Sequence, residues 1–151
     1  MTSPMLNEAI RILVAEDNED HLFLTVRALN DVEGVHLEVD AVKDGEEALD
    51  YIHRRGRFAD RERPHLILLD IKMPRIGGFE VLMQLKSDPE LRSIPVVVLT
   101  SSENQEDVET TYRLGGNSFV SKPAGMAGMR EGIRGLADYW VQLAQLPEPP
   151  R

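Results

Sequence analysis

Five reactive side chains stand just after short apolar segments of the sequence. They are three carboxylates, a hydroxyl and an amine: Glu16, Asp17, Asp70, Thr100 and Lys122. If the apolar segments are parallel strands of one sheet, their carboxyl ends share an edge, and in open α/β sheets that edge holds the ligand crevice. The spacing therefore predicts that these side chains meet in one site.

The chemistry of such a site would centre on its carboxylates. Three carboxylates in one crevice repel one another by several kcal/mol per pair at an intermediate dielectric, so either some are protonated or a cation neutralises them. Oxygen ligands favour a hard divalent ion, and Mg²⁺ fits because it takes one or two carboxylates, keeps waters and accepts a phosphate oxygen. With the ion, Lys122 and Thr100 around it, Asp70 could carry a phosphoryl group, since carboxylates are nucleophiles toward phosphorus.

Each of these residues alone has a plainer explanation. The aspartates and Thr100 could be helix caps or turn formers, and Lys122 could be a solvated surface lysine. Their joint occurrence at one predicted sheet edge favours the functional interpretation. Surface or packing roles are predicted for the histidines, which show no ligand pairing at helical or strand spacing: His21, His36, His53 and His65.

The elements that must position the five side chains alternate between strands and helices. Strands are predicted for five short segments rich in apolar or β-branched residues, at 10–15, 35–42, 66–69, 96–99 and 118–120. The first, third and fourth are almost wholly apolar, as expected of central strands covered on both faces, and the second alternates like an edge strand. We therefore predict an α/β fold with a doubly wound, five-stranded parallel sheet in the flavodoxin-like order 2-1-3-4-5.

Size and composition favour one acidic domain. The chain has 151 residues, with 17 Lys and Arg against 26 Asp and Glu, a net charge of −9. We predict a domain over 9–144 with an extended fifth helix, and flexible termini at 1–8 and 145–151. The charge argues against nucleic acid and anionic membranes as partners. The absence of cysteine, of a signal peptide and of an apolar run near ~20 residues fits a cytoplasmic protein.

Four ordered motifs carry a family resemblance. The sequence reads ILVAEDN at 12–18, LLDIKMP at 68–74 with Gly77 and Gly78 after it, VLTS at 98–101 and FVSKP at 119–123. Over residues 9–140 it resembles the receiver domains of two-component response regulators. The resemblance implies a signalling phosphoacceptor rather than an enzyme, phosphorylated by a histidine kinase, and no output domain is expected.

The same resemblance implies a role for individual residues. Asp70 would accept the phosphoryl group, Asp17 would bind Mg²⁺ directly, and Glu16 would act through water. It also implies that the backbone carbonyl of Lys72 binds the metal and that a cis peptide bond precedes Pro123. Thr100 and Lys122 would contact the phosphoryl oxygens, and Phe119 would be the aromatic switch that moves together with Thr100.

A polar insertion, HRRGRFADRERP at 53–64, is predicted to be a solvated loop, with docking of a partner as the lesser alternative. The insertion and the long last helix are similar to those of regulators paired with bacterial and cyanobacterial phytochromes. That narrower resemblance implies a bacteriophytochrome as the kinase.

Two other functions remain open at this stage. A small hydrolase of the haloacid dehalogenase type would also pass through an aspartyl phosphate, but it carries a second Asp two residues after the nucleophile, where this chain has Lys72. A receiver-like interaction module that no longer takes phosphate would normally have lost Asp70, Thr100 or Lys122, and all three are present.

The last helix predicts a homodimer. A run of apolar residues recurs at alternating spacings of three and four: Met126, Met129, Ile133, Leu136, Trp140 and Leu143. A helix of about 20 residues spans ~30 Å, which is longer than a six-residue strand at ~20 Å. We therefore expect Trp140 and Leu143 to overhang the sheet without an intramolecular partner and to form a dimer interface.

Overall fold

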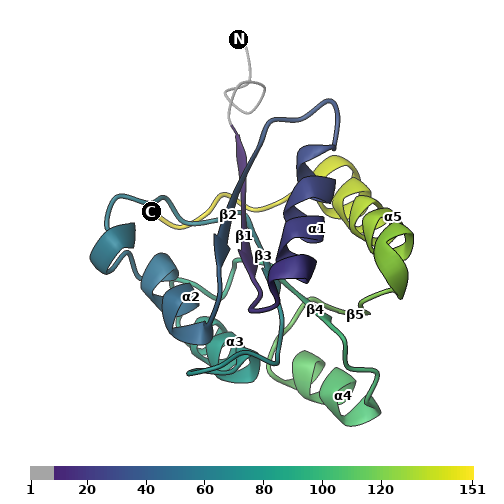
Figure 1. Cartoon of the computed structure of the whole chain (residues 1–151). Coiled ribbons are helices and arrows are strands. Elements are labelled where there is room, and N and C mark those ends of the chain that lie inside the picture. Colours follow the sequence, from purple (N-terminus) through teal and green to yellow (C-terminus); the bar gives the residue numbers. More distant parts are fainter. Residues whose placement is uncertain (1–8) are drawn as a thin grey trace.

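The computed structural model describes residues 9–151, and its centre is one five-stranded parallel sheet (Figure 1). Residues 1–8, one of the predicted flexible termini, lie outside the described residues. The predicted strand order is confirmed, because the strands run β2-β1-β3-β4-β5 across the sheet. They are β1 (Ile10–Ala15), β2 (Leu37–Val42), β3 (Leu66–Leu69), β4 (Val96–Thr100) and β5 (Ser118–Ser121).

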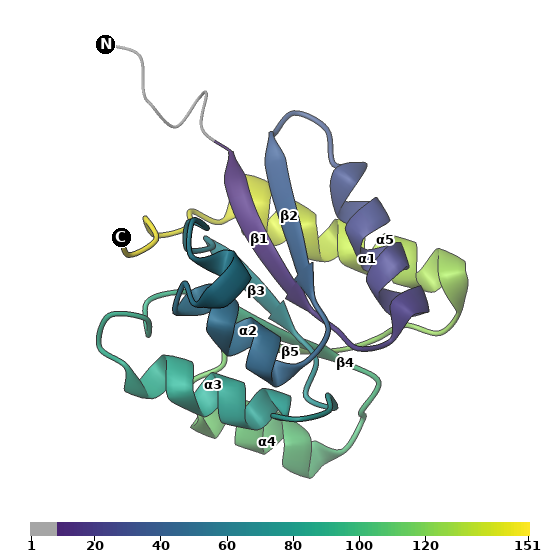
Figure 2. The same ribbon diagram turned by 60° about the vertical axis from the view of Figure 1, so that its left-hand side comes forward.

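Helices cover both faces of this sheet, as a doubly wound fold requires. They are α1 (Glu19–Asn30), α2 (Gly45–Ile52), α3 (Gly78–Ser87), α4 (Gln105–Arg113) and α5 (Gly125–Ala137). Helices α1 and α5 lie on one face, and α2, α3 and α4 on the other (Figure 2). Each helix between residues 9 and 151 is too short or too polar to cross a bilayer.

The alternation of side chains along the strands builds a separate core on each face. In β1, Leu13 and Ala15 pack among the residues of α2 and α3, whereas Ile12 and Val14 pack toward α1 and α5. All four residues of β3 are buried. This two-sided burial is the reason that the central strands are almost continuously apolar.

Short polar contacts fix where the first helices begin. Asn18 caps α1 by accepting a hydrogen bond from the amide of His21 at 3.0 Å. Asp44 caps α2 by accepting one from the amide of Glu47 at 2.7 Å. The cap at Asn18 matters for function because it places the first turn of α1 at the carboxyl end of β1.

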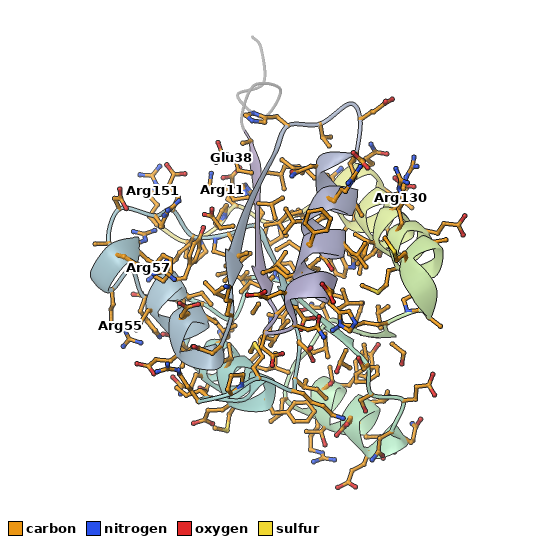
Figure 3. All side chains as sticks on the ribbon, in the orientation of Figure 1. Arg11, Glu38, Arg55, Arg57, Arg130 and Arg151 are labelled. Carbon is orange, nitrogen blue, oxygen red and sulfur yellow. The ribbon has the colours of Figure 1, made fainter. Side chains whose placement is uncertain are left out.

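The insertion at 53–64 is more ordered than the predicted solvated loop. It contains a 3₁₀ turn over Gly56–Phe58, and Phe58 is buried against Tyr51 with 5.2 Å between ring centroids. Its outer arginines form surface ion pairs: Arg55 contacts Asp50, and Arg57 contacts Glu47. Figure 3 shows Arg55 and Arg57 projecting outward from this segment. Phe58 thus anchors the 3₁₀ turn to the core, and Arg63 fixes the end of the segment by donating to the carbonyl of Ile52 at 3.1 Å.

The carboxyl-terminal helix departs from the predicted regular pattern. Helix α5 ends at Ala137 and continues as a π-helix over Asp138–Leu143. The wider π turn changes which residues face the sheet, so Val141 is buried and Trp140 is half-buried against the core. The expectation that Trp140 lacks an intramolecular partner is therefore wrong, while Leu143 is 76% exposed as expected.

The chain after this helix runs without further helix to Arg151. Its end lies beside the insertion, where Arg63 donates a hydrogen bond to the carbonyl of Arg151 at 3.0 Å. The predicted flexibility of 145–151 stays a prediction.

Candidate functional site

A pocket of about 230 Å³ lies at the carboxyl edge of the sheet. The register explains its position: Ala15 pairs with Leu69, so Glu16 and Asp70 leave neighbouring strands side by side. The amide of Lys122 donates to the carbonyl of Thr100 at 2.7 Å and aligns the other two strand ends. All five predicted side chains line this pocket, together with Asn18, His21, Lys72 and Ser101.

The three carboxylates converge as predicted. Glu16, Asp17 and Asp70 each offer an oxygen, and these atoms all lie within 4.8 Å of one another. Glu16 and Asp70 are buried, with 4% and 6% of their surface exposed, whereas Asp17 is exposed at the pocket mouth. The arrangement gives one open and two sheltered oxygen ligands to a cation entering from solvent.

Lys122 reaches into the same cluster. Its amine donates to Asp70 Oδ2 at 3.1 Å and also hydrogen-bonds Glu16 Oε1. Only 4% of the Lys122 side chain is exposed. The described residues contain no cis peptide bond, so the expected cis bond before Pro123 is wrong. The physical reason is that the Lys122 side chain already reaches both carboxylates from a trans bond, which is the form X-Pro bonds ordinarily favour.

Asp70 is held by the loop that follows it. The amide of Lys72 donates to Asp70 Oδ1 at 3.1 Å. A Cβ placed on Gly78 would lie 2.2 Å from the carbonyl oxygen of Asp70, so only glycine fits at this first position of α3. The close approach of α3 to the loop fixes the backbone of Asp70. The hydrogen bonds from the Lys72 amide and the Lys122 amine fix its carboxylate.

Burial and mutual repulsion set the charge of the pair. Burial raises the pKa of Glu16 to about 7, with the neighbouring Asp70 adding to the rise and Lys122 opposing it. Burial by itself would raise the pKa of Asp70 as well. Hydrogen bonds from Glu16 and from the Lys72 amide, together with the charge of Lys122, outweigh burial and hold the pKa of Asp70 below its usual value. The pKa of Glu16 is thus raised and that of Asp70 is lowered, so Glu16 holds its proton to a higher pH than Asp70 does.

The donor set fits a hard divalent cation. Carboxylate oxygens are the ligands that Mg²⁺ and Mn²⁺ bind in proteins. A glutamate whose pKa is raised by burial and by a neighbouring carboxylate gains from such an ion, because the ion's positive charge favours the ionised carboxylates. The residues present are thus suited to the metal that the sequence predicts.

Polar contacts extend from Thr100 toward α4. Thr100 is fully buried, and its Oγ1 lies 3.5 Å from the amide of Ser102. The Ser102 hydroxyl donates to Asp107 on α4 at 2.6 Å, and its carbonyl accepts from the Ser121 hydroxyl at 2.9 Å. Phe119, the predicted switch, is half-buried on β5, and its amide donates to the hydroxyl of Tyr112 on α4 at 3.2 Å. Sequence reasoning did not find these links, because they depend on side-chain placement across three elements.

Sequence reasoning also missed His21. The sequence predicts a surface or packing role for it, yet it lines the pocket and its Nδ1 lies 2.9 Å from Lys122 Nζ. No spacing pattern in the sequence points to it, because its place in the pocket depends on the cap at Asn18 that fixes the first turn of α1.

Comparison with known proteins agrees with this geometry. Residues 12–134 match the response regulator receiver domain, and the chain belongs to this family. The probable methanogenesis regulatory protein FilR2 of Methanothrix harundinacea is 36% identical over 138 residues, which cover 91% of this chain and 88% of FilR2. The response regulator Rcp1 of Synechocystis is 34% identical over 136 residues, covering 90% of this chain and 92% of Rcp1.

Comparison with solved structures shows that the similarity extends over nearly the whole fold. The phosphorylated cyanobacterial phytochrome response regulator RcpA superimposes with a TM-score of 0.89 at 38% identity, covering 93% of this chain and all of RcpA. The Mn²⁺-bound form of Rcp1 superimposes with a TM-score of 0.88 at 32% identity, covering 92% and 99% of the two chains. This chain is therefore a response regulator receiver whose relatives include phytochrome response regulators.

Proposed function

We propose that Asp70 accepts a phosphoryl group from a histidine kinase and that the phosphorylated receiver changes conformation to signal. One observation carries this proposal: Asp70 is buried and bound by Lys122 at the base of a pocket with two further carboxylates. In the transfer, an Asp70 oxygen attacks phosphorus, a P–O bond forms, and the P–N bond to the kinase imidazole breaks. The imidazole nitrogen keeps the electron pair and takes up a proton.

We infer that the resident cofactor is Mg²⁺, held by Asp17 and Asp70 directly, by Glu16 through water and by the Lys72 carbonyl. The ion would neutralise the charge that gathers on the phosphoryl oxygens. Lys122 and Thr100 would bind those oxygens once the phosphoryl group is on Asp70. The donor chemistry and the Mn²⁺-bound relative support this assignment.

We propose that the protein is a phosphoacceptor rather than an enzyme acting on separate substrates. The alternative hydrolase requires a carboxylic acid two residues after the nucleophile, and Lys72 occupies that position with an exposed side chain. The alternative interaction module is disfavoured because Asp70, Thr100 and Lys122 are not only present but line one pocket.

Labelling with a phosphodonor tests this proposal. With Mg²⁺ and a small phosphodonor such as acetyl phosphate, the protein should become labelled and Asp70→Asn should not. Asp60→Asn, which changes an exposed aspartate of the insertion, is the matched control and should label normally. Undiminished labelling of Asp70→Asn would contradict the assignment.

We propose a phytochrome-type histidine kinase as the partner. RcpA is a phytochrome response regulator, and this chain shares its fold over 93% of its length. The signalling reaction would take place in the cytoplasm, which the absence of cysteine suits. Phosphotransfer from a purified bacteriophytochrome kinase, compared with an unrelated kinase, tests the pairing: equal rates from both would contradict it.

We further propose that the protein forms a homodimer through its carboxyl-terminal helix. Tyr139 and Leu143 are 52% and 76% exposed, and they line a shallow hollow together with Gly135, Asp138 and Gln142. The predicted interface residues Trp140 and Leu143 stay in this proposal. Trp140 is half-buried, and the exposed Tyr139 packs edge-on against it with 5.3 Å between ring centroids, which adds aromatic surface to the interface. An exposed aromatic beside an exposed leucine is typical of an interface anchor, and a two-fold dimer is the commonest closed assembly.

A further inference from the structure

The Lys122 amine has a third partner besides the two carboxylates. Its nitrogen lies 2.9 Å from His21 Nδ1, 3.1 Å from Asp70 Oδ2 and within hydrogen-bonding distance of Glu16 Oε1. An ammonium group has three N–H donors and no acceptor. His21 Nδ1 must therefore accept, which assigns the imidazole proton to Nε2. Each of the three ammonium donors then has one acceptor.

The local fold places the imidazole there. The backbone amide of His21 donates to the side chain of Asn18, and this cap fixes the first turn of α1. His21 enters the pocket from α1, whereas Lys122 enters from the end of β5. Because only 4% of the Lys122 side chain is exposed, little water is available to replace a missing acceptor.

A divalent ion would change the balance among the three acceptors. Glu16 and Asp70 are bound by Lys122, and with Asp17 they form the carboxylate cluster that suits a metal. The ion and the ammonium carry the same sign of charge and compete for the same oxygens. Of the three acceptors, only the neutral imidazole of His21 is left to the ammonium without competition from the ion.

We propose that His21 is a positioning residue that holds the Lys122 ammonium when a divalent ion binds the carboxylates. This role rests on the proposed function, since it assumes that the carboxylate cluster binds Mg²⁺. His21 thereby keeps the ammonium in the pocket, ready for the phosphoryl oxygens, without pairing it to Glu16. The residue touches neither the phosphoryl group nor the ion in this role.

Mg²⁺ titration of the full chain, followed by calorimetry, tests the inference. His21→Leu should weaken Mg²⁺ binding, because the ammonium keeps two carboxylate acceptors in the metal-free variant but must share them with the ion when it binds. The upper limit is about tenfold, the factor that corresponds to ~1.4 kcal/mol, which is near the net value of one hydrogen bond to a charged group. His21→Asn, which keeps a neutral acceptor close to the position of Nδ1, should restore most of the affinity. His36→Leu changes an exposed histidine far from the pocket and should leave binding unchanged.

Two results would overturn the inference while leaving the proposed function intact. One is a titration in which His21→Leu binds Mg²⁺ as tightly as the unsubstituted protein, although Asp17→Asn no longer binds it. The other is an imidazole ¹⁵N spectrum of the unsubstituted protein that shows a protonated Nδ1 on His21, a readout that does not depend on any variant folding. Failure of Asp17→Asn to weaken binding would instead contradict the proposed metal site.

Discussion

Replacing Glu16 with glutamine should stabilise the metal-free protein at alkaline pH, although it removes a proposed metal ligand. The pKa of Glu16 is raised in the folded protein from its usual 4.5 to about 7, chiefly by burial. The stabilisation that goes with this raised pKa is fully present below about 4.5 and is lost as the pH rises through about 7. Glutamine resembles the protonated carboxyl and stays neutral, so the variant escapes this loss.

The size of the effect follows from the same shift. A pKa raised from 4.5 to about 7 corresponds to about 3 kcal/mol of unfolding free energy, because one pKa unit is worth about 1.4 kcal/mol. Asp70 does not obscure this window. Its pKa lies below the usual 3.8, so its contribution is present above that value and is lost only as the solution becomes strongly acidic.

Urea unfolding at a series of pH values measures the difference. In the presence of a chelator, the unfolding free energies of the two proteins should be similar at about pH 5, and Glu16→Gln should be more stable by up to about 3 kcal/mol at about pH 8.5. Adding Mg²⁺ should stabilise the unsubstituted protein more than the variant. Parallel stability curves in chelator, with no divergence above pH 7, would refute the reasoning.

Three further predictions concern the loop, the switch and the dimer. Gly78→Ala should lower the unfolding free energy by about 1–3 kcal/mol because the new Cβ would meet the Asp70 carbonyl. Gly135→Ala places a Cβ with nothing within 4 Å and should be neutral or stabilising, so equal effects of the two variants in chemical denaturation would contradict the packing argument. Beryllofluoride with Mg²⁺ should shift the NMR signals of Phe119 and Tyr112 as well as those of the pocket residues, and Tyr112→Phe should reduce the shift at Phe119. Shifts confined to the pocket residues would show that the pocket and Phe119 are not coupled. Leu143→Glu should give a folded monomer in light scattering, whereas the unsubstituted protein should be a dimer. An unsubstituted protein that is monomeric at tens of micromolar, with and without beryllofluoride, would contradict the proposed interface.

The strands, and the edge of the sheet that holds the site, could be predicted from the sequence because the patterns that indicate them lie within short segments. The segment 10–15 coincides with β1, and 66–69 coincides with β3, since a strand buried on both faces must be apolar throughout. The strand order follows from the count of strand–helix units and the resemblance to receivers. Once the order is known, the meeting of Glu16, Asp17 and Asp70 follows from the shared edge.

Other features depend on contacts that no local pattern encodes. The burial of Trp140 depends on a π-helix, which shifts the face of the helix away from the regular spacing that the sequence shows. The anchoring of the 3₁₀ turn in the insertion depends on the packing of Phe58 against Tyr51, which are seven residues apart in the sequence. His21 was missed because a single histidine carries no spacing signal until its helix cap and the position of Lys122 are known.

The most direct test of the central claim is to locate the phosphoryl group chemically on the unsubstituted protein. After phosphorylation in Mg²⁺, borohydride reduces an acyl phosphate to the alcohol, so the modified aspartate becomes homoserine and can be identified by peptide mass. The account predicts homoserine at position 70 and unmodified aspartate at position 17. Homoserine at another position, or a phosphoryl group that survives as a hydroxyl ester elsewhere in the chain, would contradict it.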